Sequence, residues 1–289
     1  MRGRGEDPVG RGRRVALGVG LALLLLGCGA VMSDEESAGL PGGPRSASFA
    51  AEHPPGTPRW RVLSFNINFG VGHDPQNLAA VAEADADLVL LQETTDASER
   101  VFREQLAERY PHMLFRQCCG AGGLGVLSKH PIVEQDYLDP TVGWFPAWRV
   151  VVDTPLGRVQ ALDVHLRPPM SDDGSWVTGF FETRGVRREE IEDLWDHLDP
   201  DLPTVIAGDF NENAHGQAVG FLAEHGLRSA LPQVRPRAKT WHWQTPVGEV
   251  HAMLDHITYG EGLGLEDAEV LDRGRSDHFP VLAVLVPAP

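Results

Sequence analysis

Basic residues are scarce in this sequence, and their scarcity restricts what the protein can bind. Lysine and arginine together number 25 against 41 aspartate and glutamate residues, which gives a formal net charge of −16 at pH 7. Proteins that hold polymeric nucleic acid over a broad footprint present a basic stripe, and no Lys/Arg-rich stripe is present here. A local basic groove remains compatible with this composition. So does a cluster of carboxylates around metal ions.

Cysteines are also few, at three in the whole chain. Their spacing matches no zinc site. Cys118 and Cys119 are neighbours, and a bridge between neighbours closes a strained ring, so a structural disulfide is not the default expectation. Free thiols, a vicinal disulfide and an intermolecular link all remain open.

Long hydrophobic runs are absent except near the beginning, where Val15–Leu26 reads VALGVGLALLLL. This run is too short to span a hydrocarbon core of ~30 Å as a permanent helix. It follows an arginine-rich stretch at residues 1–14, an order that is typical of an export signal. The sequence LLGC at residues 25–28 resembles the lipobox of bacterial lipoproteins. That resemblance implies cleavage before Cys28 and stable anchoring by several acyl chains. A plain secretory signal or an uncleaved anchor is the alternative.

The chain is expected to have three parts. Residues 1–27 form the lipoprotein signal peptide. Residues 28–58 are rich in Gly, Ser, Ala and Pro and form a flexible tether. Residues 59–289 form one catalytic domain, since no internal repeat or second linker is visible. The protein is therefore expected to be exported and membrane-anchored, on the outer side of the cytoplasmic membrane or in the outer membrane. No obligate protein partner is evident.

Short apolar strands and amphipathic helices share the folded part. The expected strands are Arg61–Ile67, Asp87–Gln92, Leu124–Ser128, Arg149–Asp153, Arg158–His165, Pro203–Ala207, Asp255–Tyr259 and Val281–Val286. The expected helices are Pro75–Ala84, Ala97–Tyr110, Val186–Leu198 and Ala214–His225. A turn at 154–157 predicts a hairpin. Strands and helices alternate without a full βαβ rhythm, which indicates a layered α/β sandwich with mixed sheets rather than a parallel barrel.

Polar residues interrupt the apolar segments at strand ends. They are Asn66, Glu93, His165, Asp209, Asn211, Asp255, Asp277 and His278. Sites in α/β proteins gather in the loops at one end of a sheet. Carboxylates, amides and histidines placed there predict an oxygen-rich metal site with acid/base partners.

Seven segments together resemble the endonuclease/exonuclease/phosphatase superfamily. They are SFNIN, LLQET, LGVLSKHPI, DVHL, AGDFNEN, LDHI and SDHFPV, in the family's order from Arg61 to the C-terminus. The resemblance implies a DNase I-like four-layer α/β sandwich, in which two packed mixed β-sheets are flanked by helices. It also implies hydrolysis of a phosphodiester or phosphomonoester by in-line attack of water.

The resemblance assigns the metal to Glu93, with Asn66 and Asp277 assisting. Mg²⁺ prefers a few carboxylate oxygens together with waters and substrate phosphate, and Mn²⁺ is the alternative ion. The alternative for Asn66 is a structural role in which its side chain caps a turn.

The remaining roles concern the water and the phosphate. Asp209 would orient or deprotonate the water, and Asn211 would bind a phosphate oxygen. An Asx turn is the bland alternative for this pair. If extended, the pair would point the same way while Phe210 faces the core. His278 would act with Asp255, which fixes its tautomer, and His165 would donate to a phosphate or leaving-group oxygen. A histidine at a strand end is ordinarily only packing.

Substrate choice is expected to lie in loops at 166–183, 143–148 and 241–243. These loops contain the aromatic residues Trp176, Phe180, Phe181 and Trp241. Three roles are open for them: stacking on bases, resting at a lipid interface or, most commonly, packing against the rims of the sandwich. Arg184, Arg187 and Arg188 are helical arginines that by default face solvent, and the alternative is that one of them reaches a substrate phosphate. A nuclease and a phospholipase C or sphingomyelinase are both compatible with this chain, and a small phosphodiester, a sugar phosphate or an inositol phosphate fits equally well as the substrate. A non-catalytic surface-binding lipoprotein would lose part of the set Glu93, Asp209, Asp255 and His278, all of which are present.

Overall fold

The computed structural model describes residues 42–47, 49, 53–171, 176–246 and 248–288. The predicted signal peptide and Cys28 lie outside these residues. No helix in this part of the chain is long and apolar enough to cross a membrane. Part of the predicted tether contacts the domain, because the Ser46 amide donates to the carbonyl of Val234. The predicted domain boundaries stay predictions.

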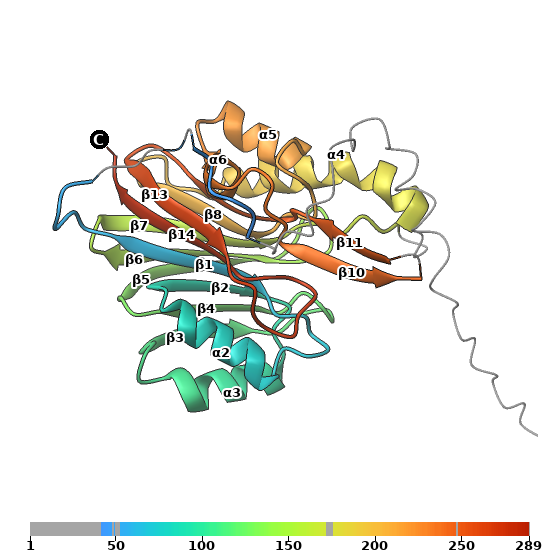
Figure 1. The fold of residues 1–289 in the computed structure, drawn as a ribbon, viewed down its shortest axis with the longest axis horizontal. Helices are drawn as coiled ribbons and strands as arrows, with labels where there is room; N and C mark the ends of the chain where they lie inside the picture. Colours follow the sequence, from blue (N-terminus) through green and yellow to red (C-terminus); the bar gives the residue numbers. More distant parts are fainter. Residues whose placement is uncertain (1–41, 48, 50–52, 172–175, 247, 289) are drawn as a thin grey trace, which may run out of the picture.

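Two mixed six-stranded sheets form the centre of the domain (Figure 1). The first runs β13 (Leu263–Val270), β14 (Val281–Pro287), β1 (Trp60–Asn66), β2 (Leu88–Gln92), β4 (Leu124–Ser128), β3 (His112–Arg116). The second runs β5 (Ile132–Leu138), β6 (Ala147–Thr154), β7 (Gly157–His165), β8 (Thr204–Asp209), β12 (Asp255–Tyr259), β9 (Arg228–Ser229). Each sheet contains one parallel pair, β1 with β2 and β7 with β8, among antiparallel pairs.

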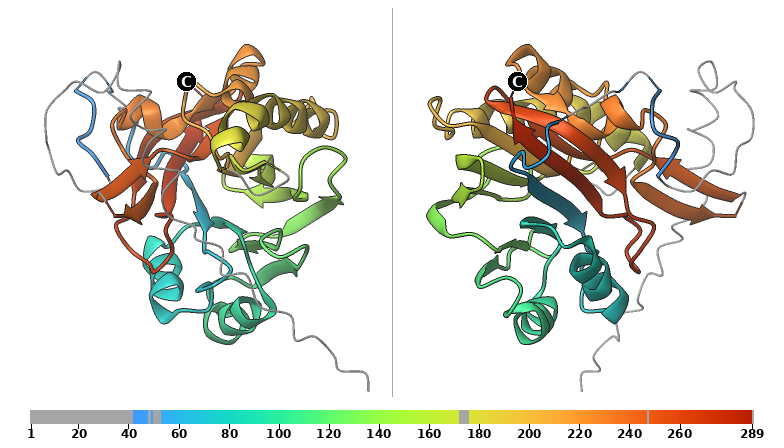
Figure 2. Two further views of the ribbon diagram at one scale, coloured as in Figure 1. Left: turned by 90° about the vertical axis from the view of Figure 1, so that its right-hand side faces the viewer. Right: turned by 60° about the vertical axis from the view of Figure 1, so that its left-hand side comes forward.

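Helices cover the outer face of each sheet and make four layers. The first sheet carries α2 (Pro75–Ala84) and α3 (Asp96–Leu106), and the second carries α4 (Trp176–Trp195) and α5 (Gln217–Glu224). Figure 2 shows the two pairs on opposite sides of the sheets. A short helix, α6 (Ala230–Val234), packs near β13. The expected DNase I-like sandwich is confirmed.

Strand β2 shows why its sequence is apolar throughout. Leu88 and Leu90 belong to the core between the sheets, whereas Val89 and Leu91 pack against the helices of the first sheet. Successive side chains of a strand point to opposite faces, so a strand in a covered sheet buries all of them. Every residue of β2 is buried. The core thus has three layers, one between the sheets and one beneath each of the two helical layers.

Most expected elements are present, and several further ones were not predicted. β3, β5, β13 and α6 were missed, as was a hairpin of β10 (Trp241–Thr245) and β11 (Gly248–Ala252) that extends beyond the sheets (Figure 1). The long loop expected at 166–183 is wrong in its second half, because α4 begins at Trp176. Gly179 reads as a helix breaker, yet a Cβ there would lie 2.2 Å from the Ser171 nitrogen. A glycine is therefore required where α4 meets residues 170–171.

Cys118 and Cys119 form a vicinal disulfide in the loop between β3 and β4. This resolves the three states that the sequence left open.

Strand register brings the polar strand ends together. His165 at the end of β7 pairs with Asp209 at the end of β8, and Asp209 in turn pairs with Asp255 on β12. On the first sheet, Asn66 at the end of β1 pairs with Gln92, the residue before Glu93. Both sheets therefore present their polar residues at the same end of the sandwich.

Candidate active site

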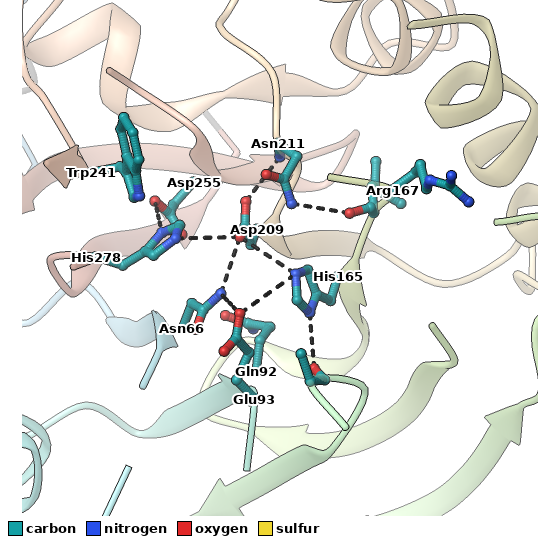
Figure 3. Close-up of polar contacts among 12 residues, drawn as sticks. Asn66, Gln92, Glu93, His165, Arg167, Asp209, Asn211, Trp241, Asp255 and His278 are labelled. Atoms are coloured by element: carbon teal, nitrogen blue, oxygen red, sulfur yellow. Dashed lines mark hydrogen bonds and ion pairs between the residues drawn. The ribbon is translucent and has the colours of Figure 1, made fainter. Parts of the chain in front are cut away.

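Asp209 lies at the centre of the polar cluster (Figure 3). Its Oδ2 is 3.1 Å from Asn66 Nδ2, 3.6 Å from His165 Nε2 and 3.5 Å from His278 Nε2. The carboxylate is 1% exposed. Burial raises the pKa of Asp209, while the neighbouring histidines oppose that rise. A buried carboxylate shared by two imidazoles and an amide can accept a proton and can orient a water.

His278 is held by Asp255 on the side away from Asp209. Its Nδ1 lies 3.0 Å from each carboxylate oxygen of Asp255. Burial lowers the pKa of His278, but the charges of Asp255 and Asp209 outweigh burial and raise the pKa to about 10. The ring is therefore an imidazolium near neutral pH, with Nε2–H directed toward Asp209.

His165 has the opposite protonation state. Burial lowers its pKa, and the charge of Asp209 only partly offsets that effect. Its Nδ1 lies 3.2 Å from the carbonyl oxygen of Ala121, so the neutral ring carries its proton on Nδ1. Its Nε2 then offers a lone pair toward Glu93 Oε1 at 3.9 Å and toward Asp209. Phe145 stacks on the ring with centroids 4.3 Å apart.

Glu93 is placed by backbone that only a few residue types adopt readily. Its φ is +62°, and Asn68 and Asn211 at the same site have φ of +56° and +51°. Such conformations cost free energy in non-glycine residues and gather at functional sites. The Glu93 carboxylate accepts from Asn66 Nδ2 at 2.9 Å and from the Phe69 amide at 3.0 Å. Burial raises the pKa of Glu93, while the hydrogen bonds from Phe69 and Asn66 and the charge of His278 oppose that rise, and Asp277 makes the smallest contribution, in the raising direction.

Asp277 lies beside this group with both carboxylate oxygens in use. Oδ1 accepts from Asn68 Nδ2 at 2.7 Å, and Oδ2 accepts from the indole N–H of Trp241 at 3.1 Å. Asn68 and Trp241 were not predicted to belong to the site. Asn68 follows Asn66 by two positions, and this spacing was the available signal.

Asn211 adopts the alternative that the sequence left open for this pair, an Asx turn, and not the extended geometry. Strand β8 ends at Asp209, and Asn211 has a positive φ rather than an extended one. The backbone N–H of Asn211 donates to Asp209 Oδ1 at 2.9 Å, and this hydrogen bond forms an Asx turn. Its side chain donates to the carbonyl of Leu166 at 3.1 Å and stays beside Asp209, while Phe210 is fully buried as expected.

Two sets of residues are candidate binding sites for a divalent cation. Asp209, Asp255 and His278 offer ligand atoms within 4.8 Å of one another. A metal there requires the neutral His278 ring and would have to displace the proton that Asp255 and Asp209 stabilise, whereas the hydrogen bonds between His278 and Asp255 already form an acid–base couple. Glu93 and Asp277 place two carboxylates together, and neither forms an ion pair with Lys or Arg in the described part of the chain. This unbalanced, oxygen-rich set fits Mg²⁺ or Mn²⁺.

The helical arginines and the aromatic rim lie around this centre. Arg187 is buried and pairs with Glu212 at 3.4 Å, which corrects the solvent-facing expectation. Arg188 pairs with Glu192, and Arg184 is exposed. The guanidinium of Arg167 lies 3.3 Å from the ring centroid of Trp144. The side chains of Trp176, Phe180 and Phe181 lie outside the described residues.

Comparison with known proteins finds a matching family and several solved structures with a similar fold. The sequence profile of the Endonuclease/Exonuclease/phosphatase family matches residues 63–278. No curated protein sequence matches the chain.

Solved structures match the fold at low identity. An endonuclease/exonuclease/phosphatase from Beutenbergia cavernae DSM 12333 is 24% identical, with a TM-score of 0.61 over 80% of this chain and 72% of that chain. The human nocturnin catalytic domain with bound sulfate anion is 18% identical, with a TM-score of 0.63 over 80% and 96%. D. rerio TDP2 complexed with single strand DNA product is 16% identical, with a TM-score of 0.61 over 78% and 98%.

Proposed function

This chain belongs to the endonuclease/exonuclease/phosphatase family, and from that premise we propose that it is a metal-dependent phosphoesterase that hydrolyses a phosphodiester or a phosphomonoester. One observation carries the proposal. Around the buried carboxylate of Asp209, one histidine is held charged and the other neutral, while Glu93 stands beside them. Titratable groups whose surroundings push their pKa values apart are typical of acid–base catalysis.

Asp209 orients the attacking water. Its Oδ1 is occupied by the Asn211 amide, and Oδ2 is the oxygen that faces both histidines and Asn66. Water that is hydrogen-bonded to Oδ2 is held for in-line attack on phosphorus, and burial makes the carboxylate a better base than one in solvent.

The two histidines act on the phosphate. The His278 imidazolium supplies positive charge as the pentacovalent transition state forms, and Asp255 keeps that charge in place. His165 is neutral, and its Nε2 faces the same centre. Its Nε2 takes up the proton that Asp209 Oδ2 accepts from the attacking water and then donates it to a phosphate or leaving-group oxygen. The amides of Asn66 and Asn211 add donors beside the carboxylates.

Glu93, assisted by Asn66 and Asp277, would hold Mg²⁺ or Mn²⁺. When bound, the cation neutralises phosphate charge and stabilises the leaving oxygen. The chain's contribution is to keep these carboxylates together, through Asn68 and the indole of Trp241.

A panel of phosphomonoesters and diesters, assayed with and without EDTA, tests the function and the substrate class together. Nicking of plasmid DNA identifies a nuclease, and release of choline phosphate from vesicles identifies a phospholipase C or sphingomyelinase. His278→Ala and Asp209→Asn are each expected to lower turnover by roughly 10²-fold or more. The exposed His197→Ala and Asp201→Asn are matched controls. Wild-type rates in either site variant would remove the assignment.

We also propose that the enzyme is exported and held at a membrane by lipid on Cys28. The LLGC sequence at residues 25–28 supports this proposal. Cys28→Ala is expected to move the protein from the membrane fraction to the soluble fraction after export. Continued membrane retention of Cys28→Ala would contradict lipid anchoring.

A further inference from the structure

The vicinal disulfide sits at the start of a tight turn. Cys118 is half-buried and Cys119 is exposed, in the loop that joins β3 to β4. Cys119 and Gly120 have φ of +43° and +72°. The amide of Gly122 donates to the carbonyl of Cys118 at 3.1 Å and closes the turn. The bridge therefore lies inside the closed part of the loop.

The same turn contacts the site at two points. The carbonyl of Ala121 faces His165 Nδ1 at 3.2 Å. The carbonyl of Gly123 accepts a hydrogen bond of 3.0 Å from the backbone amide of Thr94, the residue that follows Glu93 in the sequence. A shift of this turn would therefore reach the orientation of His165 and the backbone beside Glu93 together.

A third contact runs through the aromatic residue that stacks on His165. A Cβ on Gly122 would lie 3.0 Å from Phe145 Cδ1 and 3.0 Å from Cys119 Sγ, so the turn packs closely on Phe145. Cys119 Sγ lies 3.9 Å from the carbonyl oxygen of Trp144. Phe145 in turn lies 4.3 Å from the His165 ring, between centroids. The disulfide thus supports both the edge and the face of that imidazole.

We propose that the Cys118–Cys119 bridge is a positioning element for His165 and that turnover depends on its being oxidised. The intact bridge keeps the Ala121 carbonyl opposite Nδ1. The proton then stays on Nδ1, and the Nε2 lone pair faces Asp209. An external dithiol would cleave the S–S bond, leaving two thiols in the protein and a disulfide in the dithiol. This inference rests on the proposed phosphoesterase function.

Stability and activity should respond differently to loss of the bridge. A disulfide stabilises mainly by restricting the unfolded chain, and the restriction grows with loop length. Neighbouring residues close almost no loop. Loss of the bridge is therefore expected to leave the melting temperature nearly unchanged while it lowers kcat.

The kinetic test compares four samples: wild type and Cys118→Ser/Cys119→Ser, each before and after treatment with a phosphine reductant. Thiol labelling and mass spectrometry establish the state of the bridge. Reduced wild type and the double variant are expected to lose about 10-fold to 100-fold in kcat, with KM within about twofold, because small misplacements of catalytic groups cost this much. The double variant should not respond to reductant, which controls for effects on the metal. Unchanged kcat in both would overturn the proposal.

A second measurement does not depend on activity. Nitrogen NMR of histidine-labelled protein, with His165→Gln to assign the signal, reports which ring nitrogen of His165 carries the proton. Oxidised protein is expected to hold the proton on Nδ1, and reduced protein to show a mixture of tautomers. If the oxidised protein hydrolyses no phosphate ester but its tautomer follows the bridge, the proposed function fails and the positioning role stands. If His165 has the same tautomer in the oxidised and the reduced protein, the bridge does not position His165 and the proposal is wrong.

Discussion

His278 and His165 lie on either side of one carboxylate, and their surroundings give them opposite charges. Asp255 and Asp209 hold His278 as an imidazolium, whereas burial keeps His165 neutral. The difference follows from the second partner of each ring, a carboxylate for His278 and a carbonyl for His165. Histidine charge is thus set by neighbours that are far away in the sequence.

Asp255→Asn tests this charge assignment. Burial already lowers the pKa of His278, so loss of the Asp255 charge should move that pKa down from about 10. The imidazolium is then lost as pH rises through the lowered value. The alkaline limb of the kcat/KM profile should move to lower pH, with a loss of roughly 10²-fold or more at pH 8. The exposed Asp153→Asn should keep the wild-type profile.

Asp163 is a buried carboxyl outside the catalytic group, and one of its oxygens has no hydrogen-bond partner among the described residues. It is fully buried beneath the site, and it accepts from Gln92 Nε2 at 2.6 Å. Its Oδ2 and Gln92 Oε1 form no hydrogen bond. Burial raises the pKa of Asp163 well above its usual value, so the folded protein favours the neutral carboxyl. That contribution to stability is present below the unfolded pKa and is lost as pH rises through the folded one.

Asp163→Asn should remove this loss, because an amide stays neutral and can donate to Gln92 Oε1. We expect the stability of the variant relative to wild type to increase from pH 5 to pH 8, because the wild-type carboxyl resists the ionisation that the unfolded chain undergoes freely. Urea unfolding at both pH values measures the difference. Parallel stability curves for the two proteins would contradict the neutral carboxyl.

Single residues also mark where the sequence was insufficient. The eight residues expected at the site lie together in the structure. They could be predicted because the order of the motifs and the ends of the apolar strands are visible in the sequence. Asn211 leaves the strand that its spacing suggested, since its positive φ depends on the Asx turn with Asp209. Trp241 reaches Asp277 because its strand lies beside His278 in an isolated bridge. Contacts of this kind come from tertiary placement, which residue type does not encode.

At the scale of elements, burial on both faces decided which strands could be predicted. β4 and β12 are buried at every residue, and both were predicted with their observed bounds. β3 and β5 are edge strands with mostly half-buried or exposed residues, so their sequences carry mixed polar and apolar residues. Edge strands of this kind resemble loops in sequence. The predicted helix begins at Val186, after two glycines, whereas α4 begins at Trp176 and includes Gly179, which packs against residues 170–171, and Gly185, which has open space around it.

The parallel pair β7–β8 depends on a close approach that only glycine permits. Gly208 has φ of +152°, and a Cβ there would lie 1.8 Å from the carbonyl oxygen of Val164. Gly208→Ala should push β8 away from β7, separating His165 from Asp209. We expect a loss of roughly 3–4 kcal/mol in the free energy of unfolding and loss of activity in the folded fraction.

Gly220→Ala is the matched control for this change. Gly220 lies in α5 with no atom near its missing Cβ. Alanine there should be neutral or stabilise by about 1 kcal/mol, because glycine is a poor helix former. Denaturant unfolding of both variants measures the contrast. Equal stability of the two would show that β7 and β8 can separate without cost.

At the scale of the whole molecule, the acidic excess and the site are connected. The chain carries a net charge of −16, and its site gathers four carboxylates around two histidines. Self-repulsion of this kind destabilises the compact state. A divalent cation bound at the site would relieve it, so the stability of the entire domain should be linked to metal concentration.

Thermal unfolding with Mg²⁺ decides between the two carboxylate groups that compete for the cation. At 100 times the Kd, a bound ion stabilises by about 2.7 kcal/mol, which raises the Tm of a domain this size by about 5–10 °C. Glu93→Gln should remove most of that shift, whereas the exposed Glu104→Gln should keep it. If Glu93→Gln keeps the full shift while Asp255→Asn loses it, the ion sits with Asp209, Asp255 and His278 instead. His278 would then have to be neutral in the metal-bound protein, and Asp255 would act as a metal ligand rather than as the partner of an imidazolium.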